Sequence, residues 1–74
     1  MSKLKEIREK KNMSQTQLAK LSGINLRTIQ DYEQDKRSIN KAQLATVYAL
    51  AQTLDCTMEE LIEFKERRNG NELQ

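Results

Sequence analysis

The 74-residue sequence has no histidine and a single cysteine, Cys56. One cysteine cannot form an internal disulfide, and such sparing use is typical of a reducing compartment, so we expect a cytoplasmic protein. Without histidine, the chain lacks the common ligands of a zinc site and the base of Ser-His-Asp or Cys-His catalysis. We therefore expect no enzyme, no cofactor and no metal site.

Proline is also missing, and no long apolar run interrupts the chain. No segment approaches the roughly 20 apolar residues that span a bilayer, and no signal-peptide pattern opens the sequence, so we expect no contact with membranes. Alternating strand patterns are missing too, which favours an all-α fold. The length suits one small domain, which we place at residues 1–68, with a polar tail at residues 69–74.

Charge is unevenly distributed along the chain, although the net charge is only +2. Residues 1–41 hold ten Lys or Arg against five Asp or Glu, whereas residues 42–74 hold three against six. A polyanion would dock on the basic half of the chain. Ordinary solvated surface would give the same asymmetry, so charge alone does not decide between these interpretations.

Repeated capping signals mark the starts of helices. A capping box joins a polar N-cap to Gln or Glu three residues later, and this spacing occurs at Ser14–Gln17, Asn40–Gln43 and Thr57–Glu60. Each cap is bracketed by an apolar pair at hydrophobic-staple spacing, namely Met13–Leu18, Ile39–Leu44 and Cys56–Leu61. Asn25 is a fourth candidate N-cap. These signals predict helices at about residues 3–11, 15–22, 26–34, 41–54 and 58–66.

Apolar residues at helical spacing predict the core. They are Leu4, Ile7, Leu18, Ala19, Leu21, Ile29, Tyr32, Leu44, Val47, Tyr48, Leu50, Ala51, Leu54, Leu61, Ile62 and Phe64. Cys56 is expected to be a small buried apolar group. Left-handed backbone is expected just after three helices, at Gly23, Asp35 and Asp55.

The second and third predicted helices are separated only by residues 23–25, which is the spacing of a helix-turn-helix. At 100° per residue, Ile29, Tyr32 and Glu33 share one side of the third helix. The opposite side carries Arg27, Gln30, Asp31 and Gln34, and such side chains can hydrogen-bond to guanine, adenine or cytosine. Asp31 either accepts from cytosine or orients the Arg27 guanidinium. A generic polar helix surface would show the same stripe.

Two stretches of the sequence resemble one known family. Residues 14–33 contain an SQxxLA helix opening, a turn glycine, TI in the third helix and a following YE, and residues 50–61 resemble an LAxxLxxSxxEL ending. The chain is thus similar to the Xre/Cro and phage-repressor type of helix-turn-helix over about residues 3–64. This resemblance implies a compact five-helix, repressor-like domain that binds double-stranded operator DNA, usually as a two-fold homodimer.

The resemblance also assigns roles to individual residues. Positions expected to contact bases are Asn25, Leu26, Arg27, Thr28 and Asp31, to which the outward stripe adds Gln30 and Gln34. Positions expected to contact DNA phosphates are Gln15, Thr16, Lys36, Arg37, Asn40 and Lys41. Arg8 and Glu33 fall where the family often has an ion pair between the first and third helices. The expected function is sequence-specific DNA binding as a small transcription repressor.

Two further expectations concern protein partners. The alternative function is a protein-interaction module of the same fold, such as an antitoxin that binds a toxin or a regulator that binds another protein, with DNA binding secondary. The acidic half of the chain and the apolar positions near Phe64 would serve that function. For the homodimer, the fifth helix is the candidate contact face through Phe64 and Leu61, although Leu61 suits the core better.

Overall fold

The computed structural model describes residues 2–63, and within them every regular element is helical. In chain order these are α1 (Lys3–Lys10), α2 (Gln15–Ser22), α3 (Leu26–Glu33), the 3₁₀ turn η1 (Ile39–Lys41), α4 (Leu44–Leu54) and α5 (Met58–Leu61). The prediction of an all-α fold with five α-helices is confirmed. None of these helices has both the length and the apolar composition of a membrane span.

Local capping sets three of the predicted helix starts. The Ser14 hydroxyl accepts from the backbone N–H of Gln17 at 3.0 Å, and the Gln17 side chain accepts from the backbone N–H of Ser14 at 2.9 Å. The same reciprocal pair forms at Thr57 and Glu60. Asn25 caps α3 through its side-chain oxygen. Two capping boxes and the Asn25 cap are therefore confirmed.

Four residues adopt left-handed backbone where segments end. Gly23 has φ +77°, while Asp35 and Asp55 have φ +62° and +55°. All three were predicted from the residue types that tolerate this region. Asn12, after α1, has φ +57° and was not predicted. These residues turn the chain sharply enough to connect short helices through loops of a few residues.

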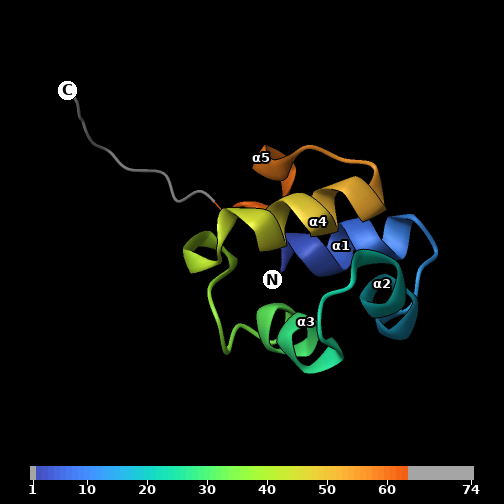
Figure 1. Ribbon diagram of the computed structural model, residues 1–74, viewed down its shortest axis with the longest axis horizontal. Helices are drawn as coiled ribbons and strands as arrows, with labels where there is room; N and C mark the ends of the chain where they lie inside the picture. Colours follow the sequence, from blue (N-terminus) through green and yellow to red (C-terminus); the bar gives the residue numbers. More distant parts are fainter. Residues whose placement is uncertain (1, 64–74) are drawn as a thin grey trace.

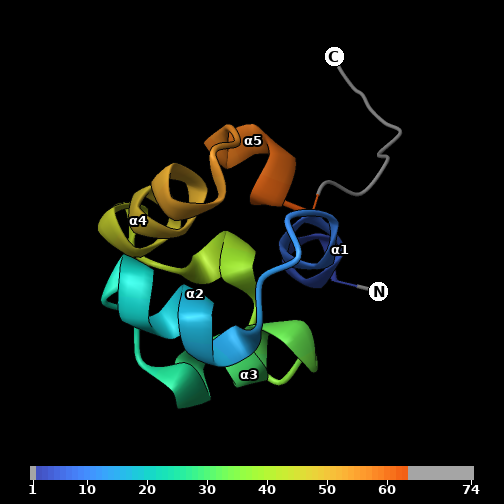
Figure 2. The ribbon, with the colours of Figure 1, turned by 90° about the vertical axis from the view of Figure 1, so that its right-hand side faces the viewer.

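The helices form a closed ring of neighbours. Each packs most extensively against two others, in the order α1, α3, α2, α4, α5 and back to α1. Figures 1 and 2 both show α3 and α5 at opposite ends of the molecule, with α1 reaching both. One face of α3 therefore remains uncovered at the end of the domain.

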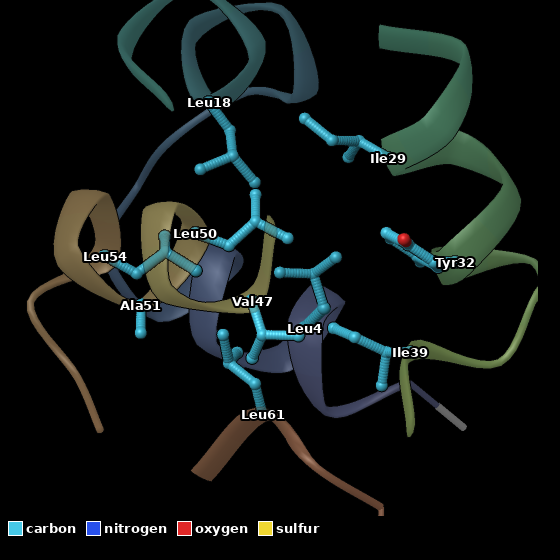
Figure 3. Packing of buried hydrophobic residues seen from close by; sticks show 10 residues of the cluster. All are labelled: Leu4, Leu18, Ile29, Tyr32, Ile39, Val47, Leu50, Ala51, Leu54 and Leu61. Atoms are coloured by element: carbon cyan, nitrogen blue, oxygen red, sulfur yellow. The ribbon is translucent and has the colours of Figure 1, made fainter. Parts of the chain in front are cut away.

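The core lies inside this ring (Figure 3). Leu50 of α4 and Leu4 of α1 point into the central space, and Leu18 and Ile29 approach from the helix-turn-helix. The buried apolar side chains are Leu4, Leu18, Ile29, Tyr32, Ile39, Val47, Leu50, Ala51, Leu54 and Leu61. Cys56 is half-buried and packs against this cluster, next to the α5 start that its staple was predicted to support.

The predicted start of the fourth helix is wrong. Asn40 lies in η1, and its side-chain amide donates to the Glu63 carbonyl at 2.8 Å and accepts from the Glu63 backbone N–H at 2.9 Å. Helix α4 begins instead at Leu44, with Gln43 as a cap that makes no side-chain bond. The staple is missing too, because Ile39 is in the core while Leu44 is 74% exposed.

Three residues predicted for the core are instead on the surface. Leu21, Leu44 and Tyr48 are all exposed. Conversely, Leu61 is fully buried, so it completes the core and cannot form a dimer face. Helix α5 ends at Leu61. Phe64, the predicted domain end at residue 68 and the predicted tail at 69–74 lie outside the described residues.

Candidate nucleic-acid interface

The helix-turn-helix is formed by α2, a short turn and α3. Gly23 closes α2 by donating its N–H to the Ala19 carbonyl at 2.9 Å, and the Ile24 N–H donates to the Ser22 hydroxyl at 3.1 Å. The side chain of Asn25 then accepts from the Arg27 N–H at 2.8 Å and starts α3. The N–H groups of Gly23 and Ile24 and the first N–H groups of α3 thus have partners within the turn, which restrains the connection between the two helices.

Helix α3 has the two faces that the sequence predicts. Ile29, Tyr32 and Glu33 are buried against the core. On the other side, Leu26, Arg27 and Gln34 are exposed, and Thr28, Gln30 and Asp31 are partly exposed. Together with Asn25 at its start, the uncovered face carries the whole set of residues expected to contact bases.

A buried ion pair holds the core-facing side of α3 in place. The Glu33 carboxylate accepts from Arg8 Nε at 2.7 Å and from Arg8 Nη2 at 3.0 Å, a bidentate geometry. Arg8 Nη1 also donates to the Met13 carbonyl at 2.7 Å. The hydrogen bond to Glu33 raises the pKa of the Arg8 guanidinium, outweighing the opposing effect of burial. The pair therefore ties α1 and the loop after it to the end of α3.

Gln15 joins this network from the first turn of α2. Its side-chain amide donates to Glu33 Oε1 at 2.9 Å. One amide N–H and the carbonyl oxygen of Gln15 remain for an external partner, since a glutamine amide has two donors and an acceptor. Thr16 is exposed beside it, at a helix start where backbone N–H groups and the helix dipole favour an anion. Gln15 and Thr16 thus lie side by side in the first turn of α2.

Asp31 connects α3 to the basic segment that follows it. Its carboxylate lies 3.3 Å from Arg27 Nε and 3.8 Å from Arg37 Nε. Its backbone carbonyl accepts from the N–H groups of Lys36 and Arg37 at 2.8 and 3.2 Å. The sequence predicted contact with Arg27 as one of two roles for Asp31. It did not predict the contacts with the segment after α3, because helical periodicity relates residues only within α3.

An open groove of about 570 Å³ lies between the start of α3 and the segment leading into α4. Two residues from the predicted base-contacting set, Asn25 and Thr28, line it together with Arg37 and Lys41 from the phosphate set. Ser38, Gln43 and Thr46 add polar groups. The fold therefore brings together residues that are far apart in the sequence on one polar, cationic surface.

The other predicted phosphate contacts lie outside this groove. Lys36 is exposed on the segment that Asp31 holds. Asn40 is exposed, but its amide clamps the backbone of Glu63, which leaves one N–H for any other partner. Four of the thirteen predicted DNA contacts are cations and one is an acid, so this set of residues has a net positive charge.

The fold and this surface define a helix-turn-helix protein. A family model described as helix-turn-helix matches residues 4–61, and the chain belongs to this family, that of the Xre/Cro-type DNA-binding transcription regulators. Among solved structures, the chain is similar to the restriction-modification controller protein C.AhdI from Aeromonas hydrophila. The two share 33% sequence identity with a TM-score of 0.72, over 81% of this chain and 86% of that one. A comparison with curated proteins gives no match.

Proposed function

We propose that the protein is a sequence-specific repressor that inserts α3 into the major groove of double-stranded DNA. The observation that carries this proposal is the uncovered polar face of α3, which lies directly beside the exposed cations Lys36, Arg37 and Lys41. Base-edge contacts require such a face, and phosphate contacts on its flank hold the helix in register. Occupation of an operator by the domain would exclude other proteins from that DNA.

Different side chains of α3 are suited to contact different bases. Arg27, whose side chain is 76% exposed, can donate two hydrogen bonds to a guanine. Gln30 and Gln34 suit adenine, and Leu26 suits a thymine methyl group. Asn25 uses its side-chain oxygen as the helix cap, so only its amide N–H groups remain for DNA.

The groove residues and the first turn of α2 supply the phosphate contacts. Arg37 and Lys41 provide charge on one flank of α3, and Thr16 with the α2 amide groups provides neutral donors on the other. Asp31 holds Arg37 near α3 as well as contacting Arg27. We propose that the protein binds as a homodimer, because two-fold operators present half-sites about 34–36 Å apart to paired recognition helices.

Selection of bound sequences from random DNA, followed by binding assays on two variants, tests the proposal. Arg27→Ala should cost about 1–3 kcal/mol on the selected site and relax the preference at one base pair. Lys36→Ala should weaken all sequences similarly and reduce the salt slope by about one unit. Lys5→Ala removes an exposed cation of α1 outside the predicted contact set and serves as the matched control.

The alternative of a protein-interaction module predicts different behaviour. Binding to DNA should weaken steeply with salt, because phosphate contacts release counterions. A toxin that co-purifies with the protein, together with weak or salt-insensitive DNA binding, would favour the antitoxin function. Unchanged binding of the selected operator by both Arg27→Ala and Lys36→Ala would show that α3 is not the recognition helix.

A further inference from the structure

Asp31 is the one acidic residue among the thirteen positions proposed to contact DNA. Its side chain is 19% exposed and lies between two arginines that are far more open to solvent, Arg27 at 76% and Arg37 at 59%. Each carboxylate oxygen faces a different arginine, because Oδ1 is 3.3 Å from Arg27 Nε and Oδ2 is 3.8 Å from Arg37 Nε. The proposed DNA-binding surface thus includes a carboxylate that would repel a phosphate.

Helix stability does not explain an acid at this position. Asp31 lies in the last turn of α3, where the helix dipole disfavours negative charge. Arg27 precedes Asp31 by four residues, which is the less favourable order for an ion pair along a helix. Neither arginine is buried, so the two pairs contribute little to the stability of the fold. The position of Asp31 is better explained by the effect of its carboxylate on the arginines.

The backbone keeps both arginines within reach of Asp31. Arg27 is one helical turn earlier on the same side of α3. Arg37 lies on the segment that leads from α3 toward α4 (Figure 1), and its N–H donates to the backbone carbonyl of residue 31 at 3.2 Å. Replacing the Asp31 carboxylate leaves these backbone relations in place. A variant at this position therefore tests the charge and not the path of the chain.

The contact with Asp31 leaves the far end of the Arg27 guanidinium available. Arg27 donates to Asp31 through Nε, and its other four N–H groups are on Nη1 and Nη2. Two of these can donate to O6 and N7 of a guanine. Asp31 can thus keep its contact while Arg27 reads a base, and the contact limits the directions in which the guanidinium points.

We propose that Asp31 is a specificity-determining residue, which weakens phosphate binding by Arg27 and Arg37 more than it weakens guanine recognition. A guanine edge is neutral, whereas each phosphate carries a negative charge that the carboxylate repels. An arginine that bridges a carboxylate and a phosphate keeps them about 6 Å apart, and in water this repulsion weakens binding about threefold. The inference deepens the proposed function and rests on it, since it concerns how the same surface rejects DNA of the wrong sequence.

The cost of the carboxylate differs between an operator and DNA of mixed sequence. On mixed-sequence DNA both arginines contact phosphates, so Asp31 weakens binding about tenfold, the product of two threefold factors. On the operator Arg27 contacts guanine and only Arg37 contacts a phosphate, so the factor is about threefold. Asp31 thereby raises the ratio of operator affinity to mixed-sequence affinity about threefold. That ratio, more than the affinity itself, determines how much of the protein occupies its site.

Fluorescence anisotropy of two labelled duplexes tests this role, with the full chain at about 50 mM salt, where screening is weak. One duplex is the operator selected from random DNA, and the other is a mixed-sequence duplex of the same length. Asp31→Asn should raise the affinity about tenfold for the mixed sequence and about threefold for the operator.

Asp35→Asn is the matched control. It removes the same charge from an exposed acid that has no ion pair within the described residues, and asparagine tolerates the left-handed backbone there. It should change the affinities for both duplexes by the same factor and leave their ratio unaltered. Far-ultraviolet circular dichroism should show unchanged helix content in both variants.

Arginine variants test whether Asp31 acts through Arg27. In the Arg27→Ala background only Arg37 remains, so Asp31→Asn should strengthen both duplexes by the same factor, about threefold. In the Arg37→Ala background it should strengthen the mixed sequence about threefold and leave the operator unchanged. A role in folding stability alone would change both duplexes alike in every background.

Three results would overturn the inference. They are an Asp31→Asn variant with the natural affinity ratio, an equal change of the ratio by Asp35→Asn, and a loss of operator affinity with unchanged mixed-sequence binding. The third result would mean that Asp31 accepts directly from a cytosine. Arg27→Ala alone reports on the proposed function: unchanged operator binding would contradict recognition by α3. A weakened operator together with an Asp31→Asn variant of natural ratio would contradict only the role of Asp31.

Discussion

Substitution of Glu33 by alanine should destabilise the protein far more than any surface change. The Glu33 side chain is 2% exposed and accepts three hydrogen bonds, two from Arg8 and one from Gln15. Alanine removes all three and leaves the buried Arg8 guanidinium facing an apolar gap. The Met13 carbonyl remains a partner for Arg8, but it carries no charge to neutralise the cation.

The expected loss is about 3–5 kcal/mol, the cost of leaving one partner of a buried ion pair uncompensated. A domain of this length is stable by only about 4–11 kcal/mol in total, at 0.05–0.15 kcal/mol per residue. Glu33→Ala should therefore remove about a quarter or more of the free energy of unfolding. For a domain of this size it should lower the melting temperature by at least roughly 12 °C.

Urea and thermal unfolding, followed by far-ultraviolet circular dichroism, measure this loss. A double-mutant cycle adds the specific test: Arg8→Met combined with Glu33→Leu replaces the pair by apolar groups of similar size. Because the pair must overcome its own desolvation, this double variant should recover at least half of the loss caused by Glu33→Ala. A stability loss below about 1 kcal/mol for Glu33→Ala would refute the reasoning. So would a double variant whose loss equals the sum of large losses in the Arg8→Met and Glu33→Leu single variants.

Two smaller predictions concern backbone strain and the thiol. Gly23→Ala should lower the free energy of unfolding by about 1–2 kcal/mol, because φ is +77° and only the left-handed backbone is strained, since no atom crowds the new methyl group. Lys20→Ala in the same unfolding assay is the control. An equal loss of stability in both variants would contradict backbone strain as the cause. Burial raises the pKa of the Cys56 thiol, with a smaller contribution from Glu60, so its thiolate is disfavoured in the folded state. The rate of Cys56 alkylation should therefore rise with pH around a higher midpoint in the native protein than in urea. The stability that the thiol contributes to the folded state should be lost as pH rises through the native pKa. A native midpoint at or below that of the unfolded chain would contradict the effect of burial.

Helix starts were predictable where the cap depends on neighbouring residues. Ser14, Asn25 and Thr57 each find a backbone N–H partner two or three residues away, so sequence spacing contains the whole interaction. The two faces of α3 were predictable for the same reason, because a period of 3.6 residues assigns each side chain to a side. Local geometry thus determined the helix-turn-helix and the two faces of α3, whereas most of the expected contact roles came from the family resemblance.

The Asn40 cap failed because its side chain found a distant partner. Both its oxygen and its nitrogen bond to the backbone of Glu63, which lies 23 residues away in the sequence. That clamp secures the segment after α5 near α1, where the Lys3 N–H also donates to the Glu63 carboxylate at 3.1 Å. A capping pattern contains only neighbouring residues, so it cannot reveal a distant partner that competes for the Asn40 side chain. Ile39 is likewise buried in the core, and Leu44 is left exposed on the surface.

Asp31 is compatible with base reading by Arg27, and the relevant magnitudes show why. The contact between them is 3.3 Å long, spaced i,i+4, with the Arg27 side chain 76% exposed, so it contributes only about 0.3–0.5 kcal/mol. A bidentate contact with guanine is worth about 1–3 kcal/mol of discrimination. Arg27 can therefore leave Asp31 for a base at little cost. The backbone carbonyl of residue 31 would still accept from the N–H groups of Lys36 and Arg37, and this contact does not depend on the Asp31 side chain.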